Sequence, residues 1–387
     1  MKKIYFLIPM LCLLTGCYNY RELNDLAIIS GVSISKDNDI YKITTEVINP
    51  KKEQDTSSAK EPDYVIYEGT GKSMQEAFRN IVKESPQKLY GAQIDILIID
   101  EKTAQEGINE ILDFFARDPE VRSEFYVTVC KNDEALKIIS PLVNISSKNI
   151  INSLKSTNTY LGTANLVTFH DLINNYLNPH IEIALPSIKV IGPPKIGESI
   201  ENIETSTSEA TTIISNIAIY KNGKMLGYLN KEESLGYNII TNNSKTILIR
   251  NEYDNKDFII NEIIDSKTKI EAKVQEKKIT ITIEGNASIA EVNKKINLES
   301  NKELTKIQKK LNNNIEKLIK TTIENTTEKY NSDVYGFKDL FYKTNSKKYK
   351  KTIKELGDNF LNNLNIEVKS NIKIIEQGNL NGGIYNE

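Results

Sequence analysis

The chain has 387 residues, of which 39% are hydrophobic and 26% are charged, so it is long enough to form two or three globular domains. Its formal net charge of -2 argues against a nucleic-acid-binding protein, which needs a basic face. It has three cysteines, Cys12, Cys17 and Cys130, too few for a small scaffold held together by disulfides.

The first seventeen residues predict an export signal. Lys2 and Lys3 precede an apolar run of about eleven residues that ends at Leu14-Thr15-Gly16-Cys17. This run is too short to cross a bilayer, which takes about 20 apolar residues. An apolar residue, two small residues and a cysteine resemble the bacterial lipobox, where the cysteine receives a diacylglyceryl group and becomes the mature N-terminus. We predict a signal peptide at 1–16 and lipidation of Cys17, the alternative being an ordinary signal with an incidental cysteine.

Residues 17–195 predict an N-terminal α+β region, which could divide into two subdomains. Turn formers at 36–39 join two apolar runs, which predicts a β-hairpin. Ser73 with Glu76 and Thr103 with Glu106 are capping boxes, each followed by an amphipathic stretch. Strands are expected at 26–34, 41–48, 64–68, 94–99, 125–130 and 181–190, and helices at 73–82, 103–115, 133–140 and within 147–178.

A polar stretch at 196–212 predicts a linker to a C-terminal α+β domain at 213–387. Asn222-Gly223 between two apolar runs predicts a hairpin. A helix at 301–329, started by Ser300 and Glu303, carries one apolar stripe, which favours packing on a sheet over a lone coiled coil. The expected fold is α+β, with mixed sheets, two to three small domains and a C-terminal antiparallel sheet packed by this helix; further elements are expected at 213–220, 225–229, 246–250, 258–264, 268–274, 279–284, 334–361 and 366–375.

Motifs for catalysis or metal binding do not emerge from the sequence. Gly71-Lys72-Ser73 matches the end of a P-loop, but position 66, where the motif needs Gly, is Ile66. His170 and His180 belong to no cluster with metal-ligand spacing. Cys130 lies in an apolar run, which predicts a buried and inert thiol. We therefore predict a binding or scaffolding protein, not an enzyme, with no metal and no cofactor beyond the lipid on Cys17.

Two charge clusters allow more than one interpretation. Arg117-Asp118-Pro119-Glu120-Val121-Arg122 follows a predicted helix, and we favour a local ion-pair corner over half of a protein interface. Seven lysines and one aspartate lie between Lys338 and Lys354. Such a segment could contact anionic lipid, each lysine near the surface contributing up to about 1 kcal/mol. A solvated helix face is the alternative that we favour from the sequence alone.

Several segments resemble the Ger(x)C family, the lipoprotein C subunits of bacterial spore germinant receptors. The resemblance extends over nearly the whole mature chain, in order and spacing. It is carried by 17–34, by 69–77, by 112–122, by Gly227-Tyr228-Leu229 with 233–236, and by 333–337. Besides Cys17, the positions that it singles out for interaction or structure are Arg21, Glu22, Asp25, Arg117, Asp118, Arg122, Glu233, Gly236, Asp333 and Gly336.

The resemblance implies a role as well as a fold. It implies an α+β ectodomain that is needed for nutrient-triggered germination. It also implies assembly with two integral membrane subunits, A and B, and a lipid-anchored location on the outer face of the spore inner membrane. The chain departs from the family pattern at Tyr18 and Leu235, where family members commonly have Trp and often have Arg, and it has no Trp.

Two other functions remain open from the sequence. A solute-binding lipoprotein of a transporter would share the signal and the length, but it should alternate strands and helices regularly in both lobes. A lipid-anchored hydrolase acting on the cortex would need a pair of carboxylates in a cleft. The expected run of hairpin strands followed by one long helix at 301–329 favours the receptor subunit over the transporter protein.

Overall fold

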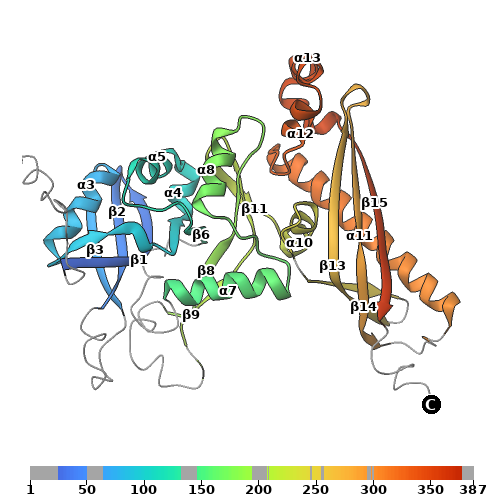
Figure 1. Ribbon diagram of the computed structural model, residues 1–387, viewed down its shortest axis with the longest axis horizontal. Helices are drawn as coiled ribbons and strands as arrows, with labels where there is room; N and C mark the ends of the chain where they lie inside the picture. The colour runs from blue at the N-terminus through green and yellow to red at the C-terminus, as the bar shows by residue number, and fades with distance from the viewer. Residues whose placement is uncertain are drawn as a thin grey trace, which may run out of the picture.

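Two α+β parts lie side by side and share a small sheet between them, as Figure 1 shows. The computed structural model describes residues 25–49, 64–131, 146–193, 207, 209–244, 246–253, 257–293, 298 and 300–376. The predicted helix at 133–140 and most of the predicted linker lie outside these ranges. Thr211 and Thr212, the last two residues of that linker, belong to a strand.

An eight-stranded mixed sheet forms the N-terminal part. Its order is β3-β2-β1-β5-β6-β8-β9, with β4 paired to β1. The predicted hairpin at 36–39 is confirmed, and both Asn38 and Asp39 have positive φ, as a two-residue hairpin turn requires. The strands are β1 (Leu26–Asp37), β2 (Ile40–Ile48), β3 (Tyr64–Gly71), β4 (Lys88–Tyr90), β5 (Ile96–Asp100), β6 (Tyr126–Lys131), β8 (Ser187–Ile191) and β9 (Thr211–Ile214).

Helices cover both faces of this sheet, which explains why β5 is a continuous apolar run. Leu97 and Ile99 face a core shared with α3 (Met74–Asn80), α4 (Glu101–Glu106), α5 (Asn109–Arg117) and α8 (Phe169–Leu177). Ile96 and Ile98 face the opposite core, which they share with α7 (Ser147–Tyr160). Cys130 is fully buried in that second core, so its predicted burial is confirmed.

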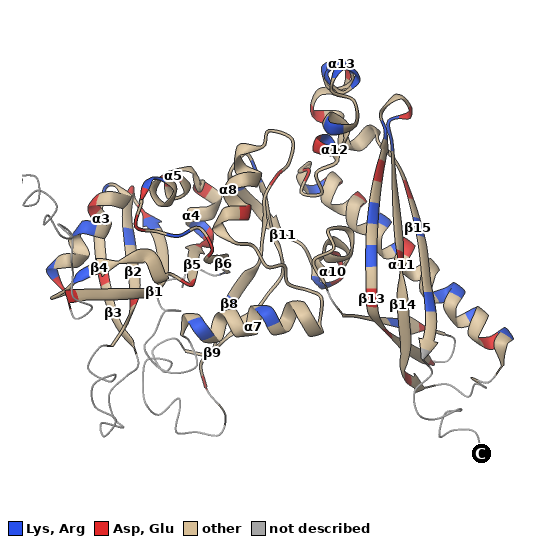
Figure 2. Cartoon of the chain, in the orientation of Figure 1, with Lys and Arg blue, Asp and Glu red and all other residues tan. Residues whose placement is uncertain are grey.

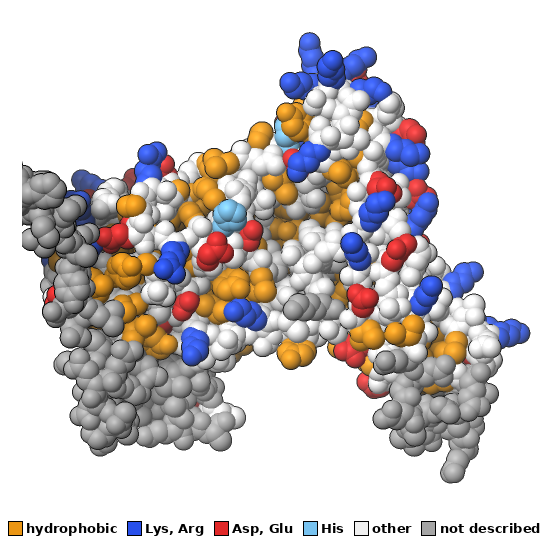
Figure 3. All heavy atoms as spheres, viewed as in Figure 1, with side chains coloured by type: hydrophobic (Ala, Val, Ile, Leu, Met, Phe, Trp, Pro, Cys, Tyr) orange, Lys and Arg blue, Asp and Glu red, His pale blue; other side chains and the backbone are white. Residues whose placement is uncertain are grey.

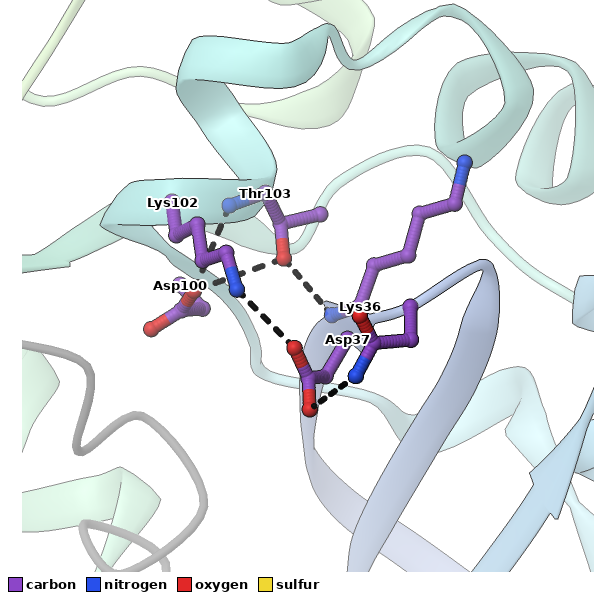
Figure 4. A network of polar contacts seen from close by, with 6 residues as sticks. Lys36, Asp37, Asp100, Lys102 and Thr103 are labelled. Atoms are coloured by element: carbon purple, nitrogen blue, oxygen red, sulfur yellow. Dashed lines mark hydrogen bonds and ion pairs between the residues drawn. The ribbon is translucent and has the colours of Figure 1, made fainter.

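The predicted helix at 103–115 is wrong in its start and in its continuity. Asp100, not Thr103, is the N-cap, because the Asp100 carboxylate accepts a hydrogen bond from the Thr103 backbone N–H at 3.2 Å. The Thr103 hydroxyl instead accepts from the Lys36 backbone N–H at 2.7 Å, and Lys102 forms an ion pair with Asp37 at 2.9 Å (Figure 4). Gly107, with φ of 132°, ends α4 before α5 begins.

A three-stranded sheet, β11-β10-β7, joins the two parts of the molecule. It consists of β7 (Ala184–Leu185), β10 (Ala218–Lys221) and β11 (Lys224–Tyr228), and the predicted turn at Asn222-Gly223 is confirmed. Successive side chains of β10 point to opposite faces. Ala218 and Tyr220 belong to the N-terminal core, whereas Ile219 packs with Tyr237, Tyr330 and Val334 of the C-terminal part. We call this sheet the shared wall.

The C-terminal part contains a four-stranded sheet packed by one long helix. Its strands are β12 (Ile247–Glu252), β13 (Phe258–Lys273), β14 (Lys278–Asn293) and β15 (Asn365–Glu376). The predicted antiparallel sheet is confirmed for β12, β13 and β14, and β15 adds to it in parallel with β14. Two predicted strands, 258–264 and 268–274, are one strand, because a register shift between Ile263 and Asp265 lets β13 continue past the polar residues.

The long helix α11 (Asn301–Tyr330) lies against this sheet, as predicted. Its buried stripe includes Ile307, Leu311, Ile315, Ile319 and Ile323. Ser300 is the N-cap, but its side chain makes no cap hydrogen bond, so the predicted capping box does not form there. Three shorter helices complete the part: α10 (Lys231–Ile240), α12 (Phe337–Thr344) and α13 (Ser346–Leu356).

Side chains of α11 hydrogen-bond along the outer edge of β15. Gln308, Asn312 and Glu316, spaced by one helical turn, accept hydrogen bonds from the backbone N–H groups of Ile374, Ile372 and Ser370. The three distances are 3.0, 2.8 and 3.0 Å. We call this row the polar ladder. It satisfies backbone groups that an edge strand would otherwise offer to another chain.

None of the helices in the described ranges is both long enough and apolar enough to cross a bilayer.

Candidate interaction site between helices α3 and α5

Two of the segments that resemble the germinant receptor family meet in one groove. Residues 73–75 come from the start of α3, and 109–120 come from α5 and the turn after it. The groove has a volume of about 860 Å³. Its lining residues are Ser73, Met74, Gln75, Asn109, Glu110, Asp113, Phe114, Arg117, Asp118, Pro119 and Glu120.

Two glycines hold α3 close to the sheet. A Cβ atom at Gly69 would lie 2.2 Å from the Ala77 carbonyl oxygen, and one at Gly71 would lie 2.5 Å from the Ala77 backbone nitrogen. Only glycine therefore permits β3 to touch the backbone of α3. Ser73 caps the helix by accepting from the Glu76 N–H at 3.2 Å, while the Glu76 carboxylate accepts from the Lys72 N–H at 2.8 Å. The glycines and Ser73 of this segment therefore serve helix packing and capping, and they account for its partial match to a P-loop without nucleotide binding.

The floor of the groove is apolar. Met74, which is buried, and Phe114 line it, and the Phe114 ring on α5 lies 5.8 Å from the Phe78 ring on α3. Phe114 also contacts Phe115, which belongs to the core, at 5.1 Å between ring centroids. Because Phe114 is only partly buried, it presents apolar surface between the two helices.

Charged groups form the rim of the groove. Arg117 Nε lies 2.7 Å from Asp113 Oδ2, one turn earlier on α5, and this guanidinium lowers the pKa of the Asp113 carboxyl group. The Asp118 carboxylate accepts from the Glu120 backbone N–H at 2.9 Å, which fixes the turn after α5. Glu120 in turn forms an ion pair with Lys88 of β4 at 2.6 Å. The ion pairs of the segment 117–122 thus run to partners outside it, Asp113 and Lys88.

The groove carries more acidic than basic side chains. Glu110, Asp113, Asp118 and Glu120 line it, against one cation, Arg117. Glu110 accepts a hydrogen bond from the Tyr41 hydroxyl, and burial together with this carboxylate raises the pKa of Tyr41. In the described part of the chain, no group of three or more His, Cys, Asp or Glu side chains is placed to hold a metal ion. Apolar floor and acidic rim together suit the binding of a polypeptide segment.

Only part of this site could be predicted from the sequence. Arg117 and Asp118 line the groove, whereas Arg122 is exposed outside it. Asp25 is exposed at the start of the described chain, and Cys17, Arg21 and Glu22 lie outside the described residues. Met74, Gln75 and Phe114 were missed as lining residues, although a large aromatic residue beside the charged turn of an amphipathic helix is a detectable signal.

Glu233 and Gly236 lie far from the groove in sequence and serve the packing of α10. The Glu233 carboxylate completes a capping box with Asn230 and accepts from the Asn325 side chain of α11 at 2.8 Å. A Cβ atom at Gly236 would lie 2.1 Å from Thr322 Oγ1, so glycine is what allows α10 and α11 to approach so closely.

Asp333 and Gly336 form the connection between α11 and α12. The buried Asp333 carboxylate accepts from the backbone N–H groups of Phe337 and Lys338, at 3.0 and 2.6 Å. Gly336, with φ of 73°, is the N-cap of α12 and adopts a left-handed conformation that favours glycine. The Asp333 carbonyl also accepts from the Glu182 N–H at 3.0 Å, which links the connection to the N-terminal part.

Comparison with known proteins supports the family to which the sequence resemblance pointed. The family model described as "Spore germination protein N-terminal domain" matches residues 19–190, and the model "Spore germination B3/ GerAC like, C-terminal" matches residues 215–378. The chain is 27% identical over 389 residues to Spore germination protein KC of Bacillus subtilis (strain 168), covering 97% of this chain and 95% of that protein. It is 23% identical over 389 residues to Spore germination protein GerQC of Bacillus cereus, covering 98% and 99%.

One solved structure has a similar fold. The crystal structure of the GerBC protein aligns with a TM-score of 0.52 at 16% identity, covering 89% of this chain and 97% of that chain. The two family models together span most of the sequence, and the relatives match it over nearly their full length. The chain therefore belongs to the Ger(x)C family of spore germinant receptor subunits.

Proposed function

We propose that this chain is the lipid-anchored C subunit of a spore germinant receptor. It assembles with the A and B integral membrane subunits on the outer face of the spore inner membrane, and nutrient-triggered germination through that receptor requires it. The groove between α3 and α5 is the docking site for another subunit. The observation that carries the docking proposal is that two separate family-like segments, 69–77 and 112–122, converge on one groove.

The lipid on Cys17 would act by confinement. Each acyl CH2 buried in the bilayer contributes about 0.8 kcal/mol, so two or three chains hold a protein at the membrane where one would not. A protein held at the surface meets its membrane partners at a raised effective concentration. Weak contacts through a groove are then sufficient for assembly, and the subunit biases the receptor toward signalling by differential contact.

The groove favours a partner segment of definite chemistry. Its acidic excess would attract a basic segment, and its apolar lining of Met74 and Phe114 would accept an apolar side chain from that segment. Glu120 and Arg117 already have ion-pair partners, so the rim is preorganised before any partner arrives.

The tether is tested by Cys17→Ala. We expect the variant to leave the membrane fraction and to abolish germination through this receptor, because no acyl chain remains to confine it. Cys12→Ala, which changes a cysteine inside the predicted signal peptide, is the matched control and should behave as wild type. A normal nutrient response by the Cys17→Ala variant would refute the tether.

The groove is tested by Gln75→Trp. Gln75 is exposed and lines the groove, so an indole ring there should obstruct a partner without disturbing the core. We expect loss of co-purification with the membrane subunits and a slower germination response, with the lipoprotein still present in the membrane fraction. Lys309→Trp, at an exposed position on α11, is the control. Equal co-purification of both variants would contradict docking at this groove.

A further inference from the structure

Helix α13 presents one face made of lysines. Lys347, Lys350, Lys351 and Lys354 recur at the spacing of one helical face, and all four are exposed. We call these four residues the lysine face. Lys348 flanks it, and Glu355 is the single acidic residue of the helix. Figure 2 shows α13 projecting from the body, and Figure 3 shows basic side chains gathered at that tip.

The opposite side of α13 is fixed to the protein, so the lysine face has a definite direction. Tyr349 is 5% exposed and its hydroxyl lies 3.1 Å from His180 Nδ1. The His180 ring also packs on Tyr342 of α12 at 4.6 Å, and the Tyr349 ring lies 6.2 Å from that of Phe360. These contacts fix the Tyr349 side of the helix against His180 and Phe360.

The charge at the start of α13 and the spacing of its lysines are unfavourable for folding alone. Lys347 lies in the first turn of α13, where a cation opposes the helix dipole and where no acidic residue compensates. Lysines four residues apart, such as Lys347 with Lys351, repel each other. None of the five lysines forms an ion pair within the part of the chain that the structure describes, whereas Lys343 on α12 does pair with Asp339. Residues that oppose local stability are expected where they serve binding.

The chemistry of the face identifies the kind of surface that it fits. A lysine ammonium is a point charge without the bidentate geometry of arginine, and α12 and α13 contain no arginine. Such a face suits many mobile phosphates better than one rigid acidic ligand. The chain as a whole is slightly acidic, with a net charge of -2, so attraction to an anionic surface needs a local cluster of cations such as this one.

We propose that the lysine face of α13 lies against anionic phospholipid headgroups and orients the protein on the bilayer. This inference rests on the proposed tether, which supplies the bilayer, but the surface itself can be tested without the lipid on Cys17. Each lysine near an anionic membrane raises the partition coefficient about fivefold, so four of them together provide a gain on the order of several hundredfold.

The experiment uses the mature chain with Cys17→Ala, so that acylation does not influence the result. Its sedimentation with phosphatidylglycerol vesicles and with phosphatidylcholine vesicles is compared at low ionic strength. We expect binding to the anionic vesicles only, weakened by added salt because the charges are exposed. Replacing the lysine face with glutamine (Lys347, Lys350, Lys351 and Lys354→Gln) should lower the partition coefficient at least tenfold.

The matched control removes the same charge elsewhere. Lys302, Lys309, Lys317 and Lys320→Gln changes four exposed lysines of α11 and should leave vesicle binding within about twofold. The α13 variant should melt at the wild-type temperature or above it, because like-charge repulsion is relieved. The inference is overturned if the α13 variant binds as wild type does, if both variants lose equal binding, or if neutral vesicles bind equally. Tighter binding to a single-stranded oligonucleotide than to the anionic vesicles would also overturn it.

Discussion

Asp333 is a buried carboxyl group held by backbone N–H donors at the start of α12. Burial raises its pKa to about 6 from the ordinary value of 3.8, and the hydrogen bonds from Lys338 and Phe337 offset only part of that rise. The folded protein therefore binds a proton here more tightly than the unfolded chain does. Protonation of Asp333 removes the cost of burying a charge in the connection between α11 and α12.

We predict that Asp333→Asn removes part of the pH dependence of stability. Because the folded pKa is raised, the wild-type stability due to Asp333 is fully present below about pH 4 and is lost as pH rises through about 6, by roughly 3 kcal/mol. Asparagine cannot ionise, so the difference in unfolding free energy between the two proteins should shift toward the variant over this window. Urea denaturation of both at several pH values measures it, and a constant difference would contradict the prediction.

Individual residues could be identified from the sequence more readily than their partners. Cys130 was predicted buried from its apolar neighbours, and it is. The capping-box spacing of Thr103 and Glu106 predicts that Thr103 is a helix cap. The true cap is Asp100, and Thr103 bonds to Lys36, 67 residues away in the chain. Such a distant partner leaves no local signal.

The polar ladder shows how one helix can protect a sheet edge. Asn312 is its central member, because its side-chain oxygen accepts from the Ile372 N–H and from the Ser370 hydroxyl at 2.6 Å. Its side-chain nitrogen donates to the Ile372 carbonyl at 2.9 Å. One amide thus satisfies both backbone groups of one residue of β15, as a neighbouring strand would.

We predict that Asn312→Ala lowers the free energy of unfolding by about 2 to 3 kcal/mol, because part-buried groups of β15 lose their partners. Asn313→Ala is a matched control, the same substitution on an exposed side of the same helix, and should change stability by about 0.5 kcal/mol or less. Denaturant titration of both variants provides the comparison. Equal effects would mean that the ladder contributes nothing to stability.

Helices and strands with strong periodicity could be predicted, whereas their continuity and their pairing direction could not. The apolar stripe of α11 and the Asn222-Gly223 turn gave correct elements. Residues 258–273 read as two strands because polar residues interrupt the alternation, yet a bulge keeps β13 continuous. The direction of β15 could not be predicted from its own residues. Its parallel pairing with β14 depends on where the chain emerges after α11, α12 and α13.

The shared wall couples the two parts of the molecule. Ile219 is fully buried in the C-terminal cluster, while its neighbours Ala218 and Tyr220 lie in the N-terminal core. β10 also pairs with Ala184 and Leu185, which come from before the predicted linker. β8, which precedes the predicted linker, and β9, which begins at its end, pair with each other as well.

We predict that Ile219→Ala destabilises both parts together. The cavity should lower the free energy of unfolding by about 2 to 5 kcal/mol. Hydrogen exchange should accelerate by a similar factor in β5, in the N-terminal part, and in β14, in the C-terminal part. Ile375→Ala, at a side chain that is 55% exposed, should leave both rates nearly unchanged. Acceleration confined to one of the two strands would show that the parts unfold separately.

At the scale of the whole molecule, the sequence predicted an α+β protein and its class of architecture, but not how the parts join. The α3–α5 groove required the packing of 69–77 against 112–122, and neither segment reveals this alone. The resemblance to the family marked both segments as important, and the structure supplied the reason that they belong together.

A common strand between two cores makes a stiff connection. For one part to rotate against the other, β10 would have to shear away from β7 while the side chains on both of its faces left their packing. A partner that moves α3 or α5 is therefore expected to move α11 and α13 with them. The two parts are therefore expected to reorient together, as one body.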